Sequence, residues 1–127
     1  MRLILVRHAE AAPGEPDDLR PLTAEGRQTA RGLGARLAGA HPDAVVSSPL
    51  LRARETAQPI AEAAGVGAEV DERLAPGATV DDVRAVVASR GATVVAVGHQ
   101  PDCSTIALEL SGRELAFPPG GFAELEL

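Results

Sequence analysis

Short apolar runs alternate along this chain with longer stretches of helical periodicity. The runs are rich in Val, Ile and Leu and are bounded by charged residues, Gly or Pro, which is typical of buried strands. They cover residues 3–6, 43–47, 68–70 and 93–97. The last residues, 122–127, alternate between apolar and polar, as a half-exposed edge strand does.

Between these runs, apolar residues recur three and four positions apart, which predicts amphipathic helices. The first helix follows Thr23, a residue type suited to the N-cap, and the second spans about 50–64 and is stopped by Gly65. Two more are expected over 80–89 and about 102–110. The stretch 11–21 is rich in Pro, Gly and Asp and is predicted to be a loop.

Strands that alternate with helices in this way predict an α/β fold. We expect a three-layer α/β/α sandwich around a mostly parallel sheet, built as a single domain over residues 1–127. Sheets of this kind bind ligands at the carboxyl ends of their strands. The site should therefore lie at that edge.

Polar residues of catalytic types follow three of the predicted strands. Arg7 and His8 come after the first strand, Arg52 follows the second shortly after Ser48-Pro49, and His99 follows the strand at 93–97. Each of these signals is weak alone. Because parallel strands end at one edge, we expect these side chains to converge on one site.

The composition excludes several classes of function. The formal net charge of −6, with no Trp or Tyr, argues against a nucleic-acid binder. All twelve basic residues are arginine, so a Walker P-loop and Schiff-base catalysis are excluded for want of a lysine. Arginine is also the cation best suited to bidentate recognition of phosphate.

The remaining bulk features concern compartment and membranes. Cys103 is the single cysteine, so no intramolecular disulfide is expected. The start MRLILVRHAE reaches Arg7 and His8 too early for a signal peptide, and no window resembles a membrane span. We therefore expect a cytoplasmic protein without membrane or nucleic-acid partners.

The combination of histidine and arginines points to phosphoryl transfer, which needs positioning and neutralisation of the equatorial oxygens. A neutral imidazole can attack phosphorus and form a phosphoramidate. His8 would be that nucleophile, with Arg7 and Arg52 as cationic forks. The two arginines should also lower the pKa of His8 and keep it neutral. No metal or other cofactor is required by this chemistry.

Three segments resemble the histidine phosphatase superfamily, also called the phosphoglycerate-mutase-like family. They read LVRHAEA, SSPLLRARETA and VGHQPD, and the resemblance spans positions 3 to about 102. It implies a phosphoglycerate-mutase-like fold, a phosphohistidine intermediate on His8, and phosphoryl binding by Arg7, Arg52 and His99. The segment DDLRPLTAEG is similar to SixA-type phosphohistidine phosphatases, which implies Arg20 as a further phosphate-site residue. Arg54 is expected to be structural.

The chain departs from many members of that superfamily at the position of the general acid. The segment DERLAPGATVDD has Ala75, Pro76 and Gly77 where a carboxylate would be expected. An alkoxide leaving group needs a proton from a positioned acid, whereas a protonated imidazole leaves as a neutral amine. The gap favours phosphohistidine on a protein as the substrate. Four nearby carboxylates remain open as acids: Asp71, Glu72, Asp81 and Asp82.

Several alternatives remain beside this hypothesis. Within the superfamily, the enzyme could be a phosphomonoesterase for a small phosphorylated metabolite; outside catalysis, it could be an inactive phosphoprotein-binding module. A serine hydrolase would use Ser48, His99 and Asp102 but lacks the nucleophile elbow. A metal site of His8, Glu10 and His99 would have arginines repelling the cation. A cysteine phosphatase is excluded because Glu109 stands where Cys103 would require an arginine.

Overall fold

A computed structural model describes all residues, 1–127, and has one five-stranded sheet with the strand order β3-β2-β4-β1-β5. The strands are β1 (Arg2–Arg7), β2 (Ala44–Ser47), β3 (Ala68–Val70), β4 (Thr93–Gly98) and β5 (Phe122–Glu126). The first four run parallel, and β5 pairs antiparallel with β1 at the sheet edge. The expected mostly parallel sheet with an alternating edge strand is confirmed.

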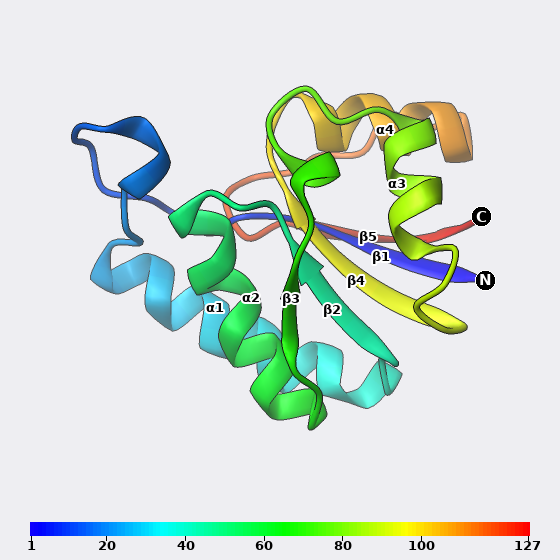
Figure 1. Cartoon of the computed structure of the whole chain (residues 1–127), viewed down its shortest axis with the longest axis horizontal. Helices are drawn as coiled ribbons and strands as arrows, with labels where there is room; N and C mark the ends of the chain where they lie inside the picture. Colours follow the sequence, from blue (N-terminus) through cyan, green and yellow to red (C-terminus); the bar gives the residue numbers. More distant parts are fainter.

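Four α-helices cover the sheet on both faces, which confirms the three-layer α/β/α prediction. They are α1 (Ala24–Leu37), α2 (Leu51–Ala64), α3 (Val80–Val87) and α4 (Asp102–Ser111), with short 3-10 turns at η1 (Asp17–Leu19), η2 (Ala38–Ala40) and η3 (Glu72–Leu74). Figure 1 shows α1 and α2 on one face and α3 and α4 on the other. No helix is both long and apolar enough to cross a membrane.

Successive side chains of β1 point to opposite faces of the sheet and so belong to two separate apolar clusters. Leu3 and Leu5 pack with residues of α3 and α4, while Ile4 and Val6 pack with residues of α1 and α2. All four side chains are almost completely buried. A strand that is buried on both sides has apolar residues at every position, which explains why residues 3–6 do not alternate between apolar and polar residues.

Helix ends follow the local signals with one exception. The Thr23 side chain accepts a hydrogen bond from Gly26 N, and Gly65 takes the left-handed conformation that ends α2. Helix α3 ends at Val87, two residues before the predicted end, because the chain turns there to enter β4. Gly91 allows that turn with a φ of +114°.

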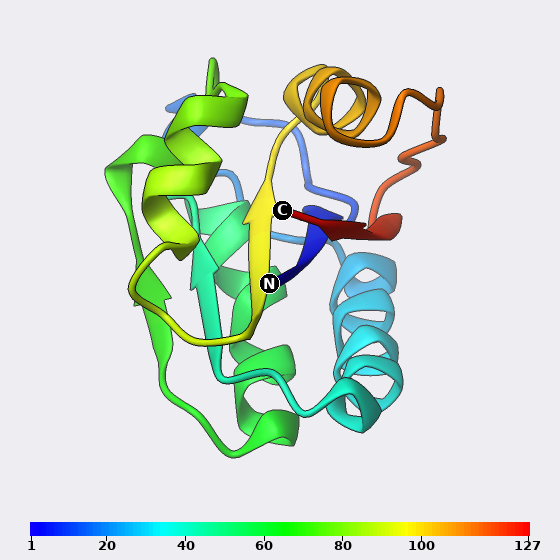
Figure 2. The same cartoon turned by 90° about the vertical axis from the view of Figure 1, so that its right-hand side faces the viewer.

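Strand register brings the ends of β1, β2 and β4 level. Arg7 lies opposite Gly98, and Ser47 lies opposite Val97. The residues that follow these strands therefore start from one edge of the sheet. The chain termini lie at the opposite end, which faces the viewer in Figure 2.

Candidate active site

His8 and His99 meet where β1 and β4 end. Their ring centroids are 5.3 Å apart and the rings are tilted by 58°. Arg52, in the first turn of α2, is close enough to both imidazoles to lower their pKa values. The structure therefore brings the ends of the three predicted strands together at one site.

The backbone decides which nitrogen of His8 carries the proton. His8 Nδ1 lies 2.7 Å from the carbonyl oxygen of Ala9, which can only accept a hydrogen bond. The proton is therefore on Nδ1, and the lone pair is on Nε2. A neutral imidazole in this tautomer is a nucleophile at Nε2.

The pKa of His8 is lowered from its ordinary value of 6.5, in the predicted direction. The main cause is burial, and the charges of Arg52, Arg7 and Arg20 add to it, while the bond to Ala9 opposes the shift. From the sequence, only Arg7 and Arg52 are expected to lower this pKa, but burial is the larger cause. Both effects keep the imidazole neutral at pH 7.

His99 is held by Ser48 at the end of β2. His99 Nε2 lies 2.7 Å from Ser48 Oγ, and that hydroxyl already accepts a bond from Leu50 N. This contact fixes the orientation of the His99 ring beside His8. Burial, helped by His8 and Arg52, lowers the pKa of His99 to about 4, so this ring is also neutral.

Arg7 is anchored by the segment before β5. Its Nη1 donates to the carbonyl oxygen of Phe117 at 3.0 Å, and Gly120 N donates to the carbonyls of Arg7 and His8. Arg7 Nε is the one buried side-chain polar atom of the protein without a partner. Residues 117–122, whose role was open from the sequence, thus hold the Arg7-His8 corner in place.

Arg20 and Arg52 share a partner that sequence reasoning missed. Arg52 Nη1 donates to the Asp17 carbonyl at 2.8 Å and Nη2 lies 3.3 Å from Asp17 Oδ2. Arg20 Nη1 donates to Asp17 Oδ1 at 3.1 Å, and its Nε donates to Ala12 O. Asp17 lies on η1, which projects from the loop after β1. Only its position three residues before Arg20 could have indicated this role.

Arg54 forms no hydrogen bond or ion pair with the residues of this cluster. Its Nε donates to the carbonyl of Pro49, and its side chain is exposed. A second neighbour was missed: Thr56 Oγ1 accepts from Ala9 N and donates to the Arg52 carbonyl. This buried hydroxyl ties the backbone after His8 to the helix that carries Arg52.

The four carboxylates considered as general acids differ in their surroundings. Asp71 binds Arg73 and Arg90, and chiefly the Arg73 hydrogen bond lowers its pKa to about 2. Asp82 closes the capping box of α3 with Thr79. Glu72 and Asp81 make no side-chain hydrogen bond or ion pair in the structure. None of the four forms a hydrogen bond or ion pair with His8 or His99, or with the three arginines of the site, Arg7, Arg20 and Arg52.

The rival site readings find little support in the geometry. Asp102, the proposed third member of a serine triad, accepts a bond from Gly77 N, and Ser48 is fully buried. Glu10 accepts from the Thr23 hydroxyl, and no group of three His, Cys, Asp or Glu is arranged to hold a metal ion. Cys103 is buried, and burial raises the pKa of its thiol to about 12.

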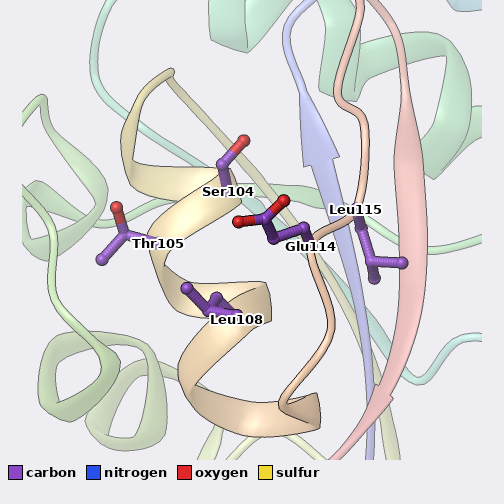
Figure 3. Close-up of a pocket in the computed structure, with 5 residues that line it drawn as sticks. All are labelled: Ser104, Thr105, Leu108, Glu114 and Leu115. Atoms are coloured by element: carbon purple, nitrogen blue, oxygen red, sulfur yellow. The ribbon is translucent and has the colours of Figure 1, made fainter.

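A surface hollow beside α4 is separate from this cluster. Figure 3 shows the residues that line it: Ser104, Thr105, Leu108, Glu114 and Leu115. It contains no histidine or arginine, so it lacks the residue types that converge at the sheet edge. The site is defined by its charges and donors at the sheet edge rather than by the depth of a cavity.

Comparison with known proteins agrees with this geometry. Residues 3–76 match the model of the histidine phosphatase superfamily (branch 1). An uncharacterised protein of Picosynechococcus sp. is 35% identical, over 98% of this chain and 84% of its own length. The protein histidine phosphatase SixA in complex with tungstate superposes with a TM-score of 0.87 at 28% identity, over 100% of this chain and 88% of that one.

The fold alone extends to more distant phosphatases. A mycobacterial glucosyl-3-phosphoglycerate phosphatase has a TM-score of 0.78 at 21% identity, over 98% of this chain and 90% of that one. The resemblance inferred from three segments is thus confirmed by a match over more than half of the sequence. The chain belongs to the histidine phosphatase superfamily, and membership of this superfamily implies phosphatase activity.

Proposed function

We propose that this enzyme hydrolyses phosphohistidine on proteins through a covalent intermediate on His8. The observation that carries the proposal is the bond between His8 Nδ1 and the Ala9 carbonyl, which directs the lone pair to Nε2. Lowering of the His8 pKa keeps that lone pair available near neutral pH.

The surrounding donors suit a phosphoryl group. Arg7 has a buried Nε without a partner, and an oxygen of the phosphoryl group would satisfy it. Arg52 and Arg20 add two further guanidinium groups, and His99 adds a neutral imidazole next to His8. Together these groups neutralise the equatorial oxygens, where the transition state holds its negative charge.

The reaction then proceeds in two balanced steps. His8 Nε2 attacks phosphorus as the P–N bond of the substrate breaks, and the substrate imidazole, protonated on its other nitrogen, leaves as a neutral ring. Water next attacks the phosphoryl group on His8, gives up a proton and releases inorganic phosphate with regenerated His8. Each step passes through an in-line arrangement of attacking and leaving groups.

The absence of a positioned acid supports a P–N rather than a P–O substrate. Ala75, Pro76 and Gly77 carry no titratable group, and Asp71 is held as an anion by Arg73. A general acid contributes about 10²–10⁴-fold to departure of an alkoxide. A protonated imidazole leaves without such help.

We also propose that the enzyme works without a metal ion. The positive charge that a divalent cation supplies in other phosphatases comes here from Arg7, Arg20 and Arg52. Their guanidinium groups remain charged at any working pH. They would also repel a cation from the position of the phosphoryl group.

The test compares kcat/KM for a phosphohistidine peptide and an alkyl phosphate monoester, both with chelator present. A preference of about 10²-fold or more for the peptide is expected, the size of a missing general acid. A preference for the monoester would contradict the proposed substrate and point to a phosphomonoesterase for small metabolites. Loss of both activities with chelator would contradict metal independence.

A further inference from the structure

Asp17 is the one carboxylate that touches the arginines of the pocket. Its Oδ1 accepts from Arg20 Nη1 and its Oδ2 lies 3.3 Å from Arg52 Nη2. Arg7, the third arginine, forms no ion pair. The Asp17 carboxylate thus occupies a place beside two cationic groups that attract phosphoryl oxygens.

The exposure of the two partners shows on which side Asp17 lies. The Arg52 side chain is 9% exposed, whereas the Asp17 side chain is 65% exposed. Asp17 therefore meets the guanidinium from the solvent side. His8 is more buried and attacks from within, so an in-line leaving group departs outward. The Asp17 carboxylate lies on this outward, solvent side of Arg52.

We propose that Asp17 is a specificity-determining residue that selects substrates by the charge of their leaving group. A fixed anion at the exit attracts a cationic leaving group and repels an anionic one. The Arg20 hydrogen bond, aided by Arg52, also lowers the pKa of Asp17, so the charge persists at every working pH.

This charge selection agrees with the proposed function. It rests on that function for one point, the identity of the natural leaving group. The protonated ring of phosphohistidine carries a positive charge while the P–N bond is intact and becomes neutral only as it leaves. Alkyl metabolites with a carboxylate beside the phosphate carry the opposite charge. Asp17 would favour the first and disfavour the second, without donating a proton to either.

The test uses two small monoesters of nearly equal size. Phosphoethanolamine carries an ammonium group, and phosphoglycolate carries a carboxylate at the matching place. We expect wild-type enzyme to prefer phosphoethanolamine in kcat/KM. Asp17→Asn keeps the shape and removes the charge, and it should reduce that preference about tenfold, the size expected for one unit charge near another at a protein surface.

The matched control is Asp18→Asn, which removes an equal charge from the adjacent exposed residue that contacts no pocket arginine. It should leave the preference unchanged. If Asp17 only orients Arg52, both substrates lose the same factor in Asp17→Asn and their ratio stays constant, which would overturn the proposal. A ratio that changes equally in Asp18→Asn would overturn it as well.

Two further measurements keep the outcome decisive. If the monoesters turn over too slowly, the inhibition constants of 2-aminoethylphosphonate and phosphonoacetate against an aryl phosphate give the same ratio. If Asp17→Asn does not fold, Asp17→Ser is used. Neither the two monoesters nor the two phosphonates contain phosphohistidine. The test of charge selection can therefore fail while the preference for phosphohistidine holds, and the reverse.

Discussion

Arg7 and Phe117 lie 110 positions apart in the sequence, yet Arg7 Nη1 donates to the Phe117 carbonyl at 3.0 Å. This bond joins the end of the first strand to the segment that precedes the last one. A guanidinium can bind that carbonyl with one nitrogen and still present others to a phosphoryl group, which an ammonium on a single flexible stem cannot do.

Replacing Arg7 by lysine should therefore be severe although it keeps the charge. We expect kcat/KM to fall about 10²-fold, comparable to the loss of one preorganised donor in a transition state. Arg54→Lys is the matched control, since Arg54 also donates to a backbone carbonyl but lies outside the pocket. An Arg7→Lys enzyme with wild-type kinetics would show that the planar, multi-donor guanidinium of Arg7 is not needed for catalysis.

The covalent intermediate should be trapped on His8. Rapid quenching of the enzyme with a ³²P-labelled substrate should give a label that is labile in acid and stable in alkali, as expected for a phosphoramidate. His8→Ala should show neither label nor turnover, because it removes the nucleophile. Normal turnover by His8→Ala would defeat the mechanism as a whole.

The rate should fall in acid as free His8 is protonated. Protonation removes the lone pair from Nε2, and the lowered pKa of His8 places the loss below 6.5. The matching titration of the His8 imidazole can be followed by NMR in the enzyme without substrate. A His8 titration above 6.5 would contradict the effect of burial.

His99 should make stability depend on pH. Its pKa is about 4 in the folded protein and 6.5 is its ordinary value, so the unfolded chain binds more protons between these limits. The contribution of His99 is fully present above about 6.5 and is lost as the pH falls toward 4. Thermal melting at several pH values should show a shallower slope for His99→Asn than for wild type, with His41→Asn, at an exposed histidine, as control.

Two glycines of α1 should respond oppositely to alanine. A Cβ on Gly26 would overlap the carbonyl oxygen of Glu10, whereas a Cβ on Gly32 meets nothing within 4 Å. Gly26→Ala should lower the free energy of unfolding by about 1–3 kcal/mol. Gly32→Ala should raise it by about 0.5–1 kcal/mol through helix propensity. Denaturant titration measures both, and equal effects would contradict the close packing at Gly26.

Much of the site could be predicted because its residues directly follow strands. The apolar runs 3–6 and 93–97 locate β1 and β4, and parallel strands end at one edge, so His8 and His99 are expected at the same edge. Arg52 follows because α2 begins at Leu51, shortly after β2 ends at Ser47. In each case the apolar pattern locates the strand or helix, and the parallel topology of the sheet places its end at the site.

The partners of those residues could not be predicted in the same way. Ser48 beside His99, Asp17 beside Arg52 and the Phe117 carbonyl beside Arg7 are all contacts between segments far apart in the chain. Asp17 lies in a 3-10 turn of three residues and Phe117 in an irregular stretch, and neither is long enough for a period to mark which side faces inward.

By itself, then, the sequence determined the alternation of strands and helices, the edge at which the site forms, and the histidines and arginines gathered there. These follow from local periodicity and from the rule that parallel strands share a carboxyl edge. Only the tertiary structure decided the tautomer of His8, the burial that lowers the pKa values of His8 and His99, and the position of Asp17 beside Arg20 and Arg52. Those properties depend on the atoms that surround each group, and folding brings these together from separate parts of the chain.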